Sequence, residues 1–173
     1  WQRYPLEYLT STVKTIYHRK TPVINVGTDP NRYQGVKYFA DDLNRLRISK
    51  KYGTIVRPQQ GYVPPPLEGI WARWPYFHNN SVASLCEVLT PAEKRQKTFY
   101  MVRAENKEKD FDSDCVGLPA PQFLNNRKDA IEFDATKKGM LSIGHDEGIF
   151  INEGIEIFTA SEKKDLIEYL KTL

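Results

Sequence analysis

The sequence has few of the residues that build metal centres, and it has no long apolar run. Its 173 residues include two cysteines, two methionines and three histidines. No stretch approaches the roughly 18 apolar residues that a transmembrane helix needs. The net charge is only +3, and basic and acidic residues are interleaved, whereas nucleic-acid-binding proteins usually present a clustered basic face. We therefore expect neither a membrane span nor a nucleic-acid partner.

Common catalytic motifs are also missing. There is no Gly-x-Ser-x-Gly elbow, no phosphate-binding loop and no His-x-x-x-His zinc helix. The histidines, His18, His78 and His145, are far apart in the sequence, so a zinc site would require the fold to bring them together. We do not expect one.

What is present is enough for one globular domain, which we place at residues 1–173. The content of hydrophobic residues is 40%, sufficient for a core. Eleven prolines and ten glycines indicate much irregular structure. We expect a mainly α fold with irregular loops and a few short strands.

The sequence pattern places the secondary-structure elements. Apolar residues at helical spacing predict helices over residues 6–17 and 34–49, with Gly53 ending the second. Ser81 is the expected N-cap of a helix over 82–89, and Thr90 that of the next turn. Aromatic and β-branched residues predict strands over 54–57, 98–103 and 131–133. Thr159 and Glu162 form a capping box that begins a C-terminal helix.

The densest aromatic stretch runs from Trp71 to His78, directly after three consecutive prolines. It holds two tryptophans, a tyrosine, a phenylalanine and a histidine in eight residues. Aromatic surface of this density forms either an ordinary core or a wall against a flat apolar partner. Composition favours the core.

This stretch carries a resemblance to a known family. GIWARWPYFHNNSVASLCEVL at residues 69–89, followed by PAEKR and KTFY, resembles the signature segment of the bacterial dihaem cytochrome c peroxidase superfamily, and is most similar to its rubber-oxygenase-like branch. INVGTDPNR at 24–32 and GHDEG at 144–148 resemble two further blocks of that branch, in the same order. In two places the sequence departs from the pattern: Trp74 replaces a small residue and Asn80 replaces a glycine.

The resemblance implies a cytochrome c-like domain that lacks its N-terminal haem-tether segment. A c-type haem is attached through Cys-x-x-Cys-His, a motif this chain does not contain. In the family the tether lies upstream of the Gly-Thr-Asp-Pro block. We therefore expect the chain, which starts at Trp1, to be the C-terminal part of a periplasmic protein. Its partner would be the missing haem-bearing segment or another chain. A redox protein would be a further partner.

The resemblance also implies a haem ligand. In the rubber-oxygenase-like branch the histidine of the last block is the second axial ligand of the C-terminal haem, and His145 occupies that place. A neutral imidazole is a good iron ligand, and the flanking glycines allow close approach to a flat macrocycle. Met140 is the fallback ligand. Without the resemblance, His145 is simply a loop histidine beside acidic residues.

Other side chains of the aromatic stretch are candidates for contact with the cofactor. His78 would lie near the haem-bearing core, either as a structural histidine or bonded to a propionate. Arg73 is a candidate for a propionate, since a guanidinium matches a carboxylate in a bidentate manner. Trp71, Trp74 and Tyr76 would supply the aromatic wall.

Two hypotheses of different class follow. The chain is either the distal side of a c-type haem centre, for electron transfer or for peroxide or oxygen chemistry, or a haem-free descendant that serves as a structural or binding subunit. An extracytoplasmic compartment favours a disulfide between Cys86 and Cys115, with two free thiols as the alternative. Whether the whole protein is an enzyme stays open.

Overall fold

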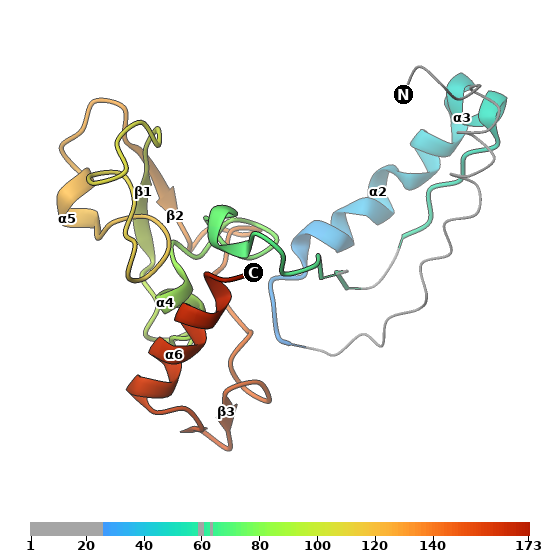
Figure 1. The fold of residues 1–173 in the computed structure, drawn as a ribbon. Coiled ribbons are helices and arrows are strands. Elements are labelled where there is room, and N and C mark those ends of the chain that lie inside the picture. Colours follow the sequence, from blue (N-terminus) through green and yellow to red (C-terminus); the bar gives the residue numbers. More distant parts are fainter. Residues whose placement is uncertain (1–25, 59–60, 63) are drawn as a thin grey trace, which may run out of the picture.

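The computed structural model of this protein describes residues 26–58, 61–62 and 64–173. Figure 1 shows two parts, an arm (residues 31–58) and a body (residues 64–173). The elements in chain order are α2 (Asn31–Arg45), α3 (Arg47–Tyr52), the 3-10 helix η1 (Ile70–Ala72), α4 (Leu85–Val88), β1 (Thr98–Met101), α5 (Pro121–Leu124), β2 (Ile131–Asp134), β3 (Ile151–Asn152), β4 (Ile155–Glu156) and α6 (Ala160–Leu170). Helices, short strands and irregular loops are therefore combined broadly as expected.

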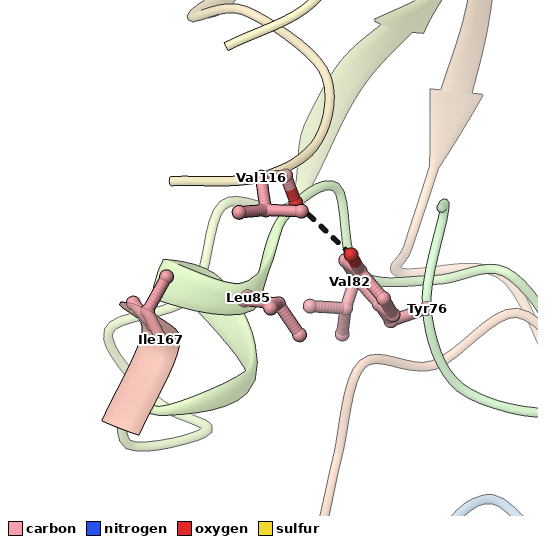
Figure 2. Packing of buried hydrophobic residues seen from close by; sticks show 5 residues of the cluster. All are labelled: Tyr76, Val82, Leu85, Val116 and Ile167. Carbon is pink, nitrogen blue, oxygen red and sulfur yellow. Dashed lines mark hydrogen bonds between the residues drawn. The ribbon is translucent and has the colours of Figure 1, made fainter. Parts of the chain in front are cut away.

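One hydrophobic core lies between α4 and α6, the two helices in contact at the lower centre of Figure 1. Figure 2 shows its buried members, which come from the aromatic stretch, the residues just before α4, α4 itself, the loop between β1 and α5, and α6: Tyr76, Val82, Leu85, Val116 and Ile167. The Tyr76 hydroxyl donates to the Val116 carbonyl at 3.1 Å, so its polar end is satisfied inside the core. Most of this core is thus built by the segment that carries the family resemblance.

A second core lies on one face of the β1–β2 sheet. The two strands pair antiparallel, with Phe99 opposite Phe133, and their rings stack at 4.8 Å. Ala83, Leu118 and Ala135 complete this cluster. Both strands were predicted from the sequence, and both are confirmed.

A disulfide joins Cys86 in α4 to Cys115, twenty-nine positions later. The segment that it holds is also hydrogen-bonded to the start of α4, because the Leu85 N–H donates to the Cys115 and Val116 carbonyls. The bridged alternative is therefore correct, and the described residues contain no free thiol.

The arm differs from the single helix expected over 34–49. The chain is helical from Asn31, but Leu46 has an extended ψ of 142°, so the helix breaks there into α2 and α3. Gly53 ends α3 in the left-handed conformation, as predicted. Residues 54–57 form no strand; the backbone N–H and carbonyl of Val56 are instead hydrogen-bonded to the Asn44 side chain.

Two expected caps were wrong. Ser84, not Ser81, caps α4, with its side chain accepting the Glu87 N–H; Ser81 instead donates its hydroxyl to the Leu141 carbonyl. α4 is accordingly much shorter than the predicted helix over 82–89. Thr90 donates to the Cys86 carbonyl and starts no helix. In both cases the hydroxyl donates to a backbone carbonyl instead of capping a helix: that of a distant loop for Ser81, and that of the preceding turn for Thr90.

The end of the chain agrees with the sequence pattern. Thr159 and Glu162 form the reciprocal capping box that begins α6, and Ile167 on its inner face is buried. The predicted helix over 6–17 lies outside the described residues. Among the helices that the structure describes, none is long and apolar enough to cross a membrane.

Candidate functional site

The site is built where the turn before α2 crosses the loop that holds His145. Asp29 in this turn is fully buried. One carboxylate oxygen accepts the backbone and side-chain N–H groups of Asn31, and the other accepts the Leu141 N–H at 3.1 Å. The Asp29 carbonyl accepts the Tyr62 hydroxyl at 2.9 Å. These bonds lower the pKa of Asp29 in spite of its burial, so a carboxylate holds the two segments together.

Gly144 allows the closest approach of these segments. Its φ is +73°, and an added Cβ would lie 2.3 Å from the Val26 carbonyl oxygen and from the Gly27 carbonyl carbon. Only glycine fits here, because both the backbone conformation and the space exclude a side chain. The two family-like blocks are therefore in direct backbone contact, between Gly144 and residues 26–28.

His145 comes directly after Gly144 and is held by the same contact between the two segments. Its backbone N–H donates to the Val26 carbonyl at 2.7 Å, and its φ is +62°. The imidazole stacks on Phe77, with ring centroids 4.2 Å apart. Burial, with smaller contributions from the nearby charges of Arg95 and His78, lowers the pKa of His145 to about 4. At neutral pH the ring is thus uncharged and has a lone pair to offer.

Arg95 fixes the loop on its other side. It is 3% exposed and donates to five backbone carbonyls. Two of these acceptors, on Ser142 and Gly144, lie directly before His145, and the others are on Glu87, Val88 and Thr90 around the end of α4. The guanidinium also lies 5.0 Å from the centre of the Phe77 ring. Arg95 therefore joins α4, Phe77 and the His145 loop into one unit.

His78 lies on the arm side of the same unit. Its ring stacks on Tyr62 at 3.8 Å, and its Nδ1 is 3.3 Å from the Thr28 hydroxyl. Its Nε2 is buried and has no hydrogen-bond partner among the described residues. Burial lowers the pKa of His78, although Asp29 opposes this shift. A buried ring nitrogen without a partner is uncommon in a folded protein and is a place for a polar group of a ligand.

The two acids after His145 are both occupied by backbone groups. Asp146 accepts the N–H groups of Ala92 and Glu147, and Glu147 accepts the N–H of Glu153. Neither carboxylate is hydrogen-bonded to the imidazole. Their roles are to shape the loop, which carries His145 and Gly148 at positive φ.

The remaining candidates from the aromatic stretch lie elsewhere. Tyr76 is buried in the first core, and Trp74 packs against both cores and stacks on Phe111 at 5.9 Å. Trp71 is 46% exposed and lines a small pocket with Phe111, Val116 and Lys171. The Arg73 guanidinium donates to the Pro66 and Glu68 carbonyls. The structure therefore brings together His78, Phe77 and His145, and places the tryptophans and Arg73 apart from them.

The structure also shows the positions of Asn80 and Met140. Asn80, which stands where glycine is usual, adopts a φ of 58°, so the turn keeps its left-handed conformation. Met140, the fallback ligand, packs against the second core beside the β1–β2 sheet. No group of three or more histidine, cysteine or acidic side chains among the described residues is arranged to hold a metal ion.

Sequence reasoning missed Arg95 and Tyr62. Arg95 stands inside a PAEKR block that resembles the family, but an arginine in a run of charged residues is typical of a solvent-exposed position. Tyr62 is an isolated tyrosine before the prolines. Nothing in the local sequence reports that either side chain reaches backbone groups far along the chain.

Comparisons with known proteins point to the same part of the chain. Residues 61–100 match the family model described as RoxA-like, cytochrome c-like. Two proteins of Sinorhizobium fredii (strain NBRC 101917 / NGR234) are similar: the uncharacterized protein y4iJ, 35% identical over 114 residues, and the uncharacterized protein y4iM, 33% identical over 124 residues. Each match covers 65% of this chain, but only 18% and 27% of the relatives. The chain thus spans less than a third of the length of either relative, and no solved structure matches.

These matches support similarity to cytochrome c-like proteins of the RoxA type, and with it a haem-related role in general. They do not select the dihaem peroxidase superfamily, which stays a prediction. The matched segment contains Tyr62, Phe77, His78 and Arg95, four of the side chains that build this site.

Proposed function

We propose that this chain is the C-terminal part of a periplasmic c-type cytochrome in which His145 is the distal axial ligand of a haem. The haem would be tethered by a Cys-x-x-Cys-His motif outside this chain, on the remainder of the protein or on a partner. When bound, haem supplies a one-electron redox centre that serves electron transfer or the activation of peroxide or oxygen. The placement of His145 is the observation that carries the proposal.

The described residues fit such a group in three respects. His145 is kept neutral, and a neutral imidazole is the form that ligates iron. The His78 Nε2 has no partner among the described residues, and it would suit a polar edge of the cofactor such as a propionate. Phe77 stacks on His145 and restricts its ring, while Arg95 and the Gly144 contact hold its backbone. This chain's contribution is to orient one ligand and to keep it unprotonated.

The second candidate is a haem-free subunit that keeps the scaffold for binding. The disulfide favours it for the chain by itself. Because Cys86 and Cys115 are bonded to each other, neither sulfur is free to form a thioether with haem. Any tether must therefore come from outside this chain, and a protein without one would be haem-free.

The deciding experiment uses the whole parent protein isolated from its native source. Mass spectrometry under denaturing conditions reports covalently attached haem, and the optical spectrum reports its spin state. With His145 as second axial ligand the haem is six-coordinate and low-spin. His145→Ala then shifts the spectrum towards high spin and lets the reduced iron bind carbon monoxide.

Met140→Leu is the matched control and leaves the low-spin spectrum unchanged. If Met140→Leu opens the iron and His145→Ala does not, the fallback ligand is the correct one. If the parent carries no haem at all, the haem-free alternative replaces the proposal.

A further inference from the structure

The far end of the arm exposes large apolar side chains. Four of them lie within ten residues of one another: Leu46, Ile48, Tyr52 and Ile55 are 48%, 63%, 58% and 66% exposed. Figure 1 shows α3 at the end of the arm that is farthest from the body. We call residues 45–57 the arm tip. An apolar cluster of this kind marks an interaction surface more often than a scattered single residue does.

The arm tip is also strongly basic. Residues 45–57 hold five basic side chains, Arg45, Arg47, Lys50, Lys51 and Arg57, and no acid, and no acid occurs anywhere between residues 43 and 67. The tip's formal charge of +5 exceeds the +3 of the complete chain. Asp42, just before the tip, pairs with Arg45 at 3.3 Å, and both side chains are largely exposed. The other four cations have no ion pair within the described residues.

Helical spacing arranges these two kinds of side chain side by side. Ile48 and Tyr52 are four residues apart on α3, and so are Arg47 and Lys51, so each pair lies on one face. The same four side chains line a shallow pocket on the surface. The Lys51 ammonium lies 5.2 Å from the centre of the Tyr52 ring. A ligand for this pocket has to combine negative charge with apolar groups.

We propose that the arm tip docks on an anionic lipid surface. The apolar side chains would enter the boundary between headgroups and acyl chains, and the lysines and arginines would contact lipid phosphates. Clusters of four to eight basic residues on an amphipathic helix are typical of anionic-lipid binding, and tyrosine favours the interfacial layer.

A lipid surface suits the tip better than an acidic protein does. A stable protein interface needs roughly 800 Å² per partner with complementary shape. The tip is a six-residue helix with its flanks, projecting from the end of an arm. A bilayer adapts to such a projection and offers charge and apolar depth at the same place. This proposal does not depend on the haem proposal, because His145 lies at the opposite end of the arm.

Vesicle sedimentation tests the proposal with the purified chain. We expect binding to vesicles of phosphatidylcholine with phosphatidylglycerol, at least about tenfold weaker binding to phosphatidylcholine alone, and loss of binding as salt is raised. The double variants K50E/K51E and I48S/Y52S should each weaken binding at least about tenfold. The body variant K107E/K109E makes the same charge change in the exposed loop between β1 and α5. This variant should bind vesicles like the unmodified chain. Circular dichroism confirms that each variant keeps its helix content.

Several results would overturn the docking site. The proposal is wrong if the chain ignores phosphatidylglycerol vesicles, or if both tip variants bind as well as the unmodified chain. It is also wrong if the tip variants convert a dimer into a monomer in sedimentation while vesicle binding is absent, since the tip would then contact a second copy. Finally, vesicle binding by the chain but not by the whole parent protein would show that another part of the parent covers the tip.

Discussion

At the scale of single residues, Gly144 decides whether the two family-like blocks can meet. Alanine there would be forced into a left-handed conformation and would bring its Cβ 2.3 Å from the backbone of residues 26 and 27. We expect Gly144→Ala to lower the free energy of unfolding by roughly 3 kcal/mol or more, measured by urea denaturation.

Gly148 is the matched control in the same loop. Its φ of +75° is nearly the same, but an added Cβ meets nothing within 4 Å. Gly148→Ala should therefore cost only the conformational part, about 1 kcal/mol. Equal losses from the two variants would mean that the contact at Gly144 is not tight in solution.

His145 should make stability depend on pH. Burial holds the pKa of the folded imidazole at about 4, against 6.5 for an ordinary histidine. Above pH 6.5 the ring is neutral in both states. Between pH 6.5 and about 4 the unfolded chain binds a proton at this ring and the folded chain does not, so the free energy of unfolding falls as the pH falls through this range. The loss from this group is at most roughly 3 kcal/mol.

Comparing the chain with His145→Gln isolates that contribution, because the carboxylates titrate in both proteins. Urea unfolding at a series of pH values between neutral and acid should show a smaller loss in the variant. NMR titration of the imidazole C–H signals gives the pKa directly. An ordinary pKa for His145 would contradict the burial of its ring.

At the scale of secondary-structure elements, α4 is too short to be stable alone and relies on its neighbours. The disulfide from Cys86 to Cys115 and the Leu85 N–H bonds to the loop between β1 and α5 hold it in place. Replacing both cysteines with alanine should lower the free energy of unfolding by roughly 3–4 kcal/mol, as closure of a loop of this length predicts.

Thiol titration of the denatured, unreduced chain checks the bridge itself and should find no reactive thiol. Reduction of the unmodified chain should reproduce the loss of stability seen in the double variant. A titration that finds two thiols would show that the bridge is absent and would contradict this prediction.

At the scale of the whole molecule, the arm and the body should differ in local stability. α2 packs on α3, but no helix or strand of the described body shares an extended interface with either of them, and Ala40 is the only buried side chain of α2. Phe99 and Phe133, by contrast, lie within the second core. Amide hydrogen exchange measured by mass spectrometry should therefore be faster in residues 31–52 than in β1 and β2.

Addition of phosphatidylglycerol vesicles should slow exchange in α3 without changing β1 and β2, if the arm tip docks as proposed. Equal exchange in arm and body before any addition would show that the arm is covered in solution.

Local signals in the sequence were sufficient where a few neighbouring residues satisfy one another. The capping box at Thr159 and Glu162 closes within four residues, and Gly53 ends α3 through its own backbone freedom. Aromatic and β-branched residues located β1 and β2. Ser84 and Ser81 were confused because both are serines before an apolar run, and only the position of the Leu141 carbonyl distinguishes them.

The sequence by itself supplied the candidates for the proposed haem-related role: three family-like blocks in order, with His145 in the last of them, and no Cys-x-x-Cys-His motif in this chain. Only the tertiary structure decided how they meet. Gly144 against residue 26, Arg95 on the Ser142 and Gly144 carbonyls, and Phe77 on His145 all join positions distant in the chain. Such contacts leave no local pattern, because a backbone carbonyl is the same acceptor at every residue. Their geometry depends on the packing of the two cores.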